Sequence, residues 1–160
     1  MDIKWVTLLM GEMKIFKGSE LVKTTLGSCV GIVLYSPTHN ALGFVHIVLD
    51  VSKDRKVEET ARYADTAIPA LIEKLQGLGI PKNALKAKVA GGANMFSQIP
   101  QAALPKIGEK NIQKVREILS DLRIPITGED LGGTFGRQMW VDVGQKTVKI
   151  SRIGGEQLEI

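Results

Sequence analysis

Two apolar runs lie close together in the first third of the chain, and they constrain the fold more than any other feature. They read CVGIVLYS over residues 29–36 and ALGFVHIVLD over residues 41–50. Each is far shorter than the roughly 20 residues needed to span a bilayer. Each is apolar on both faces and rich in β-branched residues, which predicts two central strands covered on both sides by helices or by a second sheet. The intervening turn formers, SPTHN, predict a hairpin.

The hydrophobic period becomes helical in two later segments. Over residues 58–76 apolar residues recur at intervals of three and four, and Gly77, Gly79 and Pro81 predict the end of that helix. A second helix is expected over residues 109–122. The inner faces are expected to carry Ala61, Ala64, Ile68, Leu71, Ile72 and Leu75 in the first helix, and Ile112, Val115, Ile118 and Leu119 in the second.

The other patterned segments predict further strands. They are residues 2–10 and 12–18, separated by Gly11; residues 83–90, which run into Gly91–Gly92; residues 124–130, which precede Gly132–Gly133; and a hairpin over residues 137–153 that turns near Gly144. Many strands with two helices predict a layered α+β fold, with sheets in a β-sandwich-like arrangement flanked by helices.

Length and composition limit the classes of function. A chain of 160 residues with 44% apolar and 24% charged residues predicts one domain over residues 1–160. One cysteine excludes an internal disulfide, and one cysteine with two histidines argues against a structural zinc site. The net charge of +4 is dispersed and aromatic residues are only 5%, which argues against nucleic-acid binding. No signal peptide or membrane-length segment is evident, so we expect a cytoplasmic protein without membrane insertion.

The single cysteine and one histidine fall on the two predicted central strands. If the hairpin loop has four residues, 36–39, Tyr35 faces Asn40 and Cys29 faces His46 on the same side of the sheet. A loop of five residues would place His46 on the other side. The spacing therefore permits a Cys–His pair without requiring one.

The residues that flank the cysteine favour acyl-transfer chemistry. Gly27 leaves room for a substrate to approach, and the backbone N–H groups of Gly27, Ser28 and Cys29 are candidate donors to an oxyanion. Thr24 and Thr25 lie just upstream and offer hydroxyls to the imidazole or the substrate.

Such a pair has two interpretations. A thiol becomes a good nucleophile when a nearby imidazole takes its proton, and the resulting imidazolium can protonate a leaving amine. The alternative is an inert core thiol and a hydrogen-bonded core histidine, which are common on apolar strands. Elsewhere, the glycine pairs of VAGGANMF and EDLGGTFGR predict shaped loops, with Asp130 and Arg137 as loop-stabilising charges, and RYAD is expected to cap or pack the first helix.

Six segments together resemble the CheD family of bacterial and archaeal chemotaxis proteins. In chain order they are TTLGSCVGIVLYSP, GFVHIVL, RYADTAIPALIEKL, KAKVAGGANMF, GEDLGGTFGR and VKISRIGGEQLEI, and they extend over nearly the whole chain. The resemblance implies a fold like that of the catalytic domain of glutamine-deamidating toxins, a β-sandwich flanked by helices. It also implies an enzyme, a chemoreceptor glutamine deamidase that converts selected receptor glutamines to glutamates and ammonia.

The resemblance also implies the functional residues. The family nucleophile is the cysteine of the G-S-C motif, here Cys29, and the family base is the histidine of the next strand, here His46. A threonine shortly before G-S-C is the third. An ungapped comparison with T-x-G-L-G-S-C members points to Lys23, whereas T-x-L-G-S-C members point to Thr24, which we favour, with Thr25 as the alternative. No metal or organic cofactor is implied.

The family resemblance extends to partners. The substrates are methyl-accepting chemotaxis receptors, and the phosphatase CheC is a possible partner of an expected monomer. The alternative function is a non-catalytic binding module that acts by occupying receptor or CheC. A transglutaminase or protease would use the same acyl-enzyme chemistry. Asp50 stands where many members carry proline, and this departure is expected to affect the following loop.

Overall fold

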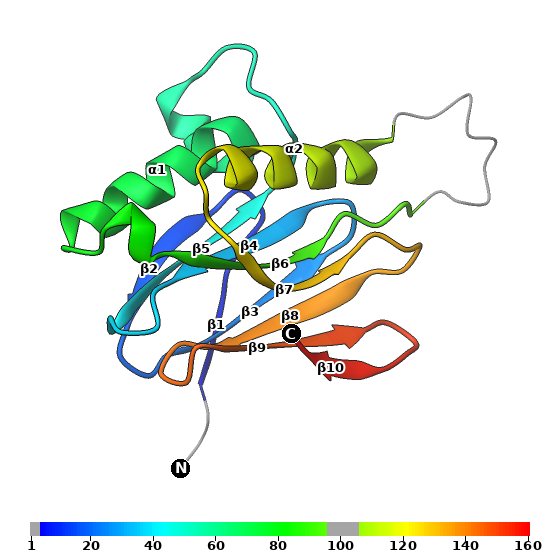
Figure 1. Ribbon diagram of the computed structural model, residues 1–160. Coiled ribbons are helices and arrows are strands. Elements are labelled where there is room, and N and C mark those ends of the chain that lie inside the picture. The colour runs from blue at the N-terminus through cyan, green and yellow to red at the C-terminus, as the bar shows by residue number, and fades with distance from the viewer. Residues whose placement is uncertain (1–3, 96–105) are drawn as a thin grey trace.

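The computed structural model describes residues 4–95 and 106–160, and these residues form two five-stranded sheets. One has the strand order β2-β5-β4-β6-β7 and the other β1-β3-β8-β9-β10. Helices α1 (Ala64–Gly77) and α2 (Ile107–Asp121) lie over the first sheet, and the second sheet lies on its opposite side (Figure 1). The predicted layered α+β fold is confirmed, with both helices on one side.

The first sheet contains the two strands predicted to be central. Its members are β2 (Met13–Lys17), β5 (Ala41–Ile47), β4 (Val30–Tyr35), β6 (Lys86–Gly91) and β7 (Ile126–Leu131). The second sheet comprises β1 (Trp5–Thr7), β3 (Leu21–Leu26), β8 (Arg137–Asp142), β9 (Thr147–Arg152) and β10 (Gln157–Glu159). Of the pairs in the two sheets, β1–β3 and β6–β7 are parallel.

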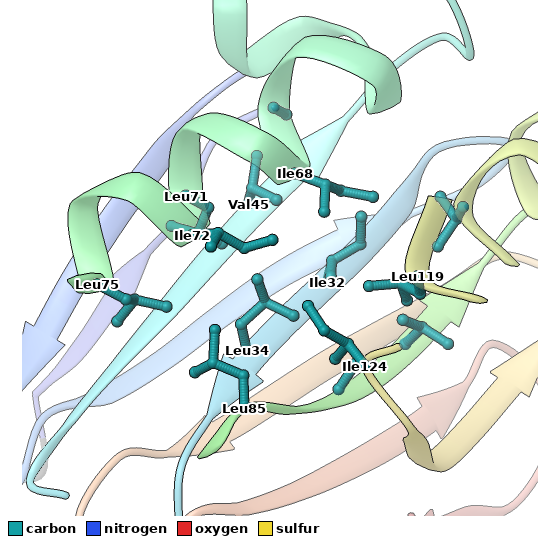
Figure 2. Packing of buried hydrophobic residues seen from close by; sticks show 14 of the residues in the cluster. Ile32, Leu34, Val45, Ile68, Leu71, Ile72, Leu75, Leu85, Leu119 and Ile124 are labelled. Atoms are coloured by element: carbon teal, nitrogen blue, oxygen red, sulfur yellow. The ribbon is translucent and has the colours of Figure 1, made fainter. Parts of the chain in front are cut away.

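Strands β4 and β5 send alternate side chains into two separate cores. Toward the helices, Ile32, Leu34 and Val45 pack with Ile68 and Leu71 of α1 (Figure 2). Toward the second sheet, the core is built from side chains of both sheets, including Val33, Phe44, Val22, Leu26, Met139 and Val141. Because each face has its own apolar cover, both strands can be apolar throughout, as the sequence predicted.

Neither loop length considered for the β4–β5 hairpin is right: the four-residue loop misplaces the register by two residues and the five-residue loop by one. Tyr35 pairs with Leu42 rather than with Asn40, and His46 consequently faces Gly31 rather than Cys29. The connection is longer because Ser36 is buried and its Oγ hydrogen-bonds with Nδ1 of His39 at 2.7 Å. A shift of two residues preserves the strand face, so Cys29 and His46 remain on the same side of the sheet.

The predicted first helix is divided in two. Residues Val57–Arg62 form a 3₁₀ helix, η1, and α1 begins only after Tyr63, whose backbone is extended with φ −119° and ψ 139°. The carbonyl of Arg62 accepts hydrogen bonds from the N–H groups of Val48 and Leu49, and Tyr63 forms a parallel bridge with Leu49. Pairing with the chain after β5 therefore interrupts the helix. A second short 3₁₀ helix, η2 (Lys82–Ala84), precedes β6.

The loop after β5 is tied to the start of α1. The N–H of Asp65 donates to the carbonyl of Asp50, and the Asp65 carboxylate accepts the N–H of Ser52 at 2.9 Å and an Arg55 guanidinium at 3.3 Å. The loop after Asp50, which was expected to differ from that of other family members, is therefore held by the Asp65 carboxylate. The N-cap of α1, Tyr63, makes no side-chain capping bond.

Candidate active site

Thr24 and His46 meet between the two sheets, and Cys29 lies in the apolar core that the sheets share. Thr24 comes from β3 in the second sheet, His46 from β5 in the first sheet, and Cys29 from the bend that leads into β4. All three are buried, with exposed fractions of 2% for Thr24, 2% for His46 and 7% for Cys29. The site therefore lies where the two sheets face each other, on the side away from the helices.

The hydrogen bonds of Thr24 determine which nitrogen of His46 carries the proton. Thr24 Oγ1 lies 2.7 Å from the Leu8 carbonyl oxygen and 2.7 Å from His46 Nδ1. A carbonyl oxygen only accepts, so the single hydroxyl proton goes to Leu8 and Thr24 Oγ1 accepts from Nδ1–H. This network assigns the proton of the neutral ring to Nδ1 and leaves the lone pair on Nε2.

His46 is suited to act as a base rather than as a fixed cation. Burial lowers the pKa of His46 to about 4, so the ring is neutral near pH 7. Among the described residues Nε2 is buried and has no hydrogen-bond partner. The backbone of His46 is held on both sides, by Gly11 N–H and by the carbonyl of Glu12. An oriented imidazole with a free Nε2 lone pair is what a general base requires.

Cys29 lies two residues before the strand partner of His46. His46 pairs with Gly31, and Cys29 is in the bend that precedes the paired residues of β4. Burial raises the pKa of the Cys29 thiol, while the positive charge of Arg62 and the backbone N–H of Cys29 act in the opposite direction. The resting pair is therefore a neutral thiol and a neutral imidazole.

The glycines after β6 shape the segment that carries Cys29. Gly91 has φ +114°, and a Cβ there would lie 2.1 Å from the Cys29 carbonyl oxygen, so only glycine fits. The N–H of Gly92 donates to that carbonyl at 2.8 Å, and the N–H of Ala93 donates to the Gly27 carbonyl at 2.9 Å. The two bonds hold the residues on either side of Ser28.

A second glycine pair, Gly132–Gly133, is hydrogen-bonded to the segment that begins with Gly91. The N–H of Gly132 donates to the Gly91 carbonyl at 2.9 Å, and the N–H of Asn94 donates to the Gly133 carbonyl at 2.8 Å. The loop between β7 and β8 is therefore hydrogen-bonded to the loop that holds Cys29, although the two glycine pairs are 41 positions apart in the sequence.

A buried ion-pair cluster fixes this β7–β8 loop. Arg137 is fully buried and donates to the carboxylate of Asp130 at 3.0 Å, to the Asp130 carbonyl and to the Gly132 carbonyl. Arg152 donates to the other carboxylate oxygen of Asp130. The guanidinium of Arg137 also stacks on the ring of Phe135, 4.6 Å from its centroid. The prediction that Asp130 and Arg137 stabilise loops is confirmed.

The alternation of β3 separates Thr24 from the two other candidates for the third residue. Thr25 is exposed and pairs across the strand with Gln138, and Lys23 places its ammonium 5.5 Å from the ring centroid of Trp140. The geometry therefore brings Thr24 alone of the three to His46. Gly27 and Ser28 are half-buried next to Cys29.

Two residues near the site were not predicted. Arg62 contributes the positive charge that acts on Cys29, and it was assigned to the first helix because of its place in RYAD. Asn111 of α2 hydrogen-bonds to the backbone next to Cys29. The sequence signal for Asn111 is a polar residue four positions before Val115, on the buried face of an amphipathic helix.

Comparison with known proteins identifies the family of the chain. A family model described as CheD chemotactic sensory transduction matches residues 49–152. The probable chemoreceptor glutamine deamidase CheD of Clostridium botulinum is 40% identical over 156 residues, which cover 96% of each chain. The chain belongs to the CheD family. The protein of the same name from Clostridium kluyveri is 40% identical over 157 residues, again covering 96% of each chain.

These comparisons cover different parts of the chain. The match to the family model begins after His46, whereas the similarity to the relatives covers almost the whole chain. The predicted family membership is confirmed. Of the helices in the described ranges, none has both the length and the apolar character needed to cross a membrane.

Proposed function

We propose that this CheD family member hydrolyses the side-chain amides of glutamines in methyl-accepting chemotaxis receptors, in a single deamidase domain over residues 1–160. The relatives carry the name chemoreceptor glutamine deamidase. The observation that carries the proposal is the proton assignment at His46: Leu8 and Thr24 hold the ring so that the Nε2 lone pair is free, on the sheet face that also carries Cys29.

The first half of the reaction forms an acyl-enzyme. His46 Nε2 takes the Cys29 proton as Sγ attacks the glutamine Cδ, and the carbonyl oxygen becomes an oxyanion. Because thiol and imidazole are both neutral at rest, proton transfer accompanies the attack. The imidazolium then protonates the leaving nitrogen, so the C–N bond breaks, ammonia departs and a thioester remains.

The second half regenerates the thiol. His46, neutral again, takes a proton from water, and the oxygen of that water attacks the thioester carbon. The C–S bond breaks, the thiolate recovers a proton from the imidazolium, and the receptor keeps a glutamate. One amide and one water are consumed, and one carboxylate and one ammonium ion are formed. The proton transfers and the two attacks use the side chains of Cys29 and His46 together with water.

The decisive experiment incubates the purified protein with an amidated cytoplasmic fragment of a chemoreceptor. Mass spectrometry of receptor peptides identifies each glutamine converted to glutamate. Cys29→Ala and His46→Gln are measured alongside, and circular dichroism verifies that both variants are folded. We expect conversion by the wild type, none by Cys29→Ala, and strongly reduced conversion by His46→Gln. Full conversion by folded Cys29→Ala would refute Cys29 as the nucleophile.

The raised pKa of Cys29 favours one alternative, a binding module that acts by occupancy, because a neutral buried thiol is also what a core residue has. The proposed partners are the receptors and the phosphatase CheC, with the protein acting as a cytoplasmic monomer. Binding to a receptor fragment or to CheC without any amide hydrolysis by the wild type would favour this alternative. Sedimentation of the protein alone and with CheC tests the oligomeric state and the partner.

A further inference from the structure

Asn111 is a buried polar residue that connects the two halves of the site. It lies on the inner face of α2 with an exposed fraction of 1%. Its Nδ2 donates to the carbonyl of Ser28 at 3.0 Å and to the carbonyl of Val48 at 2.9 Å. Ser28 precedes Cys29, and Val48 is the first residue after β5, which carries His46.

The chemistry of these contacts requires an amide. Both acceptors are carbonyl oxygens, so the group between them must supply two protons, as an uncharged NH₂ group does. A buried lysine or arginine would also supply donors, but at the cost of desolvating a charge. The other end of the Asn111 amide, Oδ1, is buried without a partner among the described residues. An acceptor left unpaired in this way is costly, so the fold alone does not explain the choice of asparagine.

The contact with Ser28 sets the direction of the Cys29 N–H. None of the described peptide bonds is cis, so the carbonyl of Ser28 and the N–H of Cys29 point in opposite directions. The carbonyl points to Asn111 on α2, which lies outside the first sheet (Figure 1). The Cys29 N–H therefore points away from α2, toward the side where Thr24 and His46 lie.

The neighbouring strand β6 and the glycine after it do not accept a hydrogen bond from the Cys29 N–H. Gly92 N–H donates to the Cys29 carbonyl, but among backbone bonds of the described residues none runs from Cys29 N–H. The reason is the positive φ of Gly91 and Gly92, +114° and +69°. The Gly92 carbonyl lies against the start of α2, where a Cβ on Gly108 would be 2.5 Å from its oxygen. The Gly92 carbonyl is therefore turned away from Cys29 and does not accept its N–H.

We infer that Asn111 is a positioning residue for catalysis. By holding the carbonyls of Ser28 and Val48, it directs the Cys29 N–H at the oxygen that becomes negative when the thiolate attacks, and it fixes Cys29 relative to His46. This inference rests on the proposed deamidase function. Donors aligned in advance with a developing oxyanion stabilise the transition state more than the bound substrate.

The test replaces Asn111 by residues that lack the donors. Asn111→Leu removes the amide while keeping the same number and branching of heavy side-chain atoms, and Asn111→Asp keeps the shape but offers the two carbonyls a carboxylate. Gln113 is an exposed amide on the same helix, so Gln113→Leu and Gln113→Glu are matched controls. We expect kcat for ammonia release from the receptor fragment to fall by about 10–100-fold, with KM within about twofold, in the Asn111 variants alone.

A second measurement needs no receptor. The Cys29 N–H lowers the thiol pKa, so a misdirected N–H reduces the thiolate fraction. We expect the rate of Cys29 alkylation by iodoacetamide at pH 8 to fall by about threefold to tenfold in Asn111→Leu and to stay at the wild-type value in Gln113→Leu. If Asn111→Leu alkylates more slowly than the wild type, as expected, but the wild type deamidates nothing, the proposed function fails and the positioning of Cys29 by Asn111 stands.

The result that overturns the inference is a folded Asn111→Leu with wild-type kcat and wild-type alkylation rate. A rise in KM at constant kcat also overturns it, because that result assigns Asn111 to substrate binding. If Asn111→Leu does not fold, Asn111→Asp is measured in the same two assays. Failure of both variants to fold, with both controls intact, assigns Asn111 to stability alone and removes the positioning role.

Discussion

Replacing Thr24 with valine tests the proton assignment at His46. Valine has nearly the same shape as threonine but lacks the hydroxyl, which lies 2.7 Å from both the Leu8 carbonyl and His46 Nδ1. The buried Leu8 carbonyl loses its donor, which costs about 1–3 kcal/mol in the free energy of unfolding. His46 then either buries an unpaired Nδ1–H or moves the proton to Nε2. In the second case the ring cannot accept the Cys29 proton.

The effect on catalysis follows from the lost base. A positioned general base contributes about 10²–10⁴-fold to the rate, so kcat of Thr24→Val should fall at least about 100-fold, or about 2.7 kcal/mol in activation free energy. Ammonia release from an amidated receptor fragment measures kcat, and urea unfolding measures stability. Thr24→Ser restores the hydroxyl and should recover most of the activity.

The neighbouring threonine provides the matched control. Thr25 is exposed and lies on the other face of β3, so Thr25→Val should keep the wild-type kcat. The reasoning is refuted if folded Thr24→Val retains wild-type kcat, because a tautomer fixed by Thr24 would then be irrelevant to the reaction. Loss of activity in Thr25→Val but not in Thr24→Val would instead point to Thr25 as the third functional residue.

Three further predictions concern charge and stability. Removing the positive charge in Arg62→Gln should raise the Cys29 pKa and slow alkylation by iodoacetamide at pH 8, whereas Arg62→Lys should not. Arg137→Leu leaves the buried Asp130 carboxylate with only Arg152, so urea unfolding should report a loss of about 3–5 kcal/mol. The folded-state pKa of His46 is about 4, below the usual 6.5, so the unfolded chain binds the proton first as pH falls. Stability should therefore decline between pH 6.5 and 4, by about 3 kcal/mol in total, and His46→Gln should remove that part of the decline.

The sequence predicts most of the first sheet because its signals are local. Continuous apolar runs at residues 30–35 and 41–47 are possible only where both strand faces are covered, and the structure provides helices on one face and a sheet on the other. The helical period likewise predicted α2 to within two residues. In contrast, β3 and β10 were not predicted. Threonine, lysine and glutamate interrupt their apolar pattern. The partner of β3, β8, is distant in the sequence, and β10 has only three residues, which pair with the preceding strand β9.

The site was only partly predictable because it depends on contacts between distant segments. Face alternation is a property of sequence, but whether Cys29 and His46 share one side of the sheet depends on the length of the loop between them, which the sequence left open. The register depends on how Ser36 and His39 fold the connecting loop, and no periodicity encodes that. The contact of Thr24 with Leu8 likewise depends on how β1 and β3 pair. The family resemblance favoured Thr24 and kept Thr25 as the alternative, and the three-dimensional arrangement separates the two.

Burial of Cys29 and His46 also determines the charge state in which the two side chains react. Desolvation raises the thiol pKa and lowers the imidazole pKa, so each shift makes the ion pair less stable than the two neutral groups. A thiolate is therefore rare until a substrate carbonyl can share the developing negative charge. The fixed groups around Cys29, namely its own N–H, the charge of Arg62 and the Thr24 bond to His46, all favour the charged arrangement that follows proton transfer. Their stabilisation is consequently greatest in the transition state, which is where an interaction must act to raise kcat.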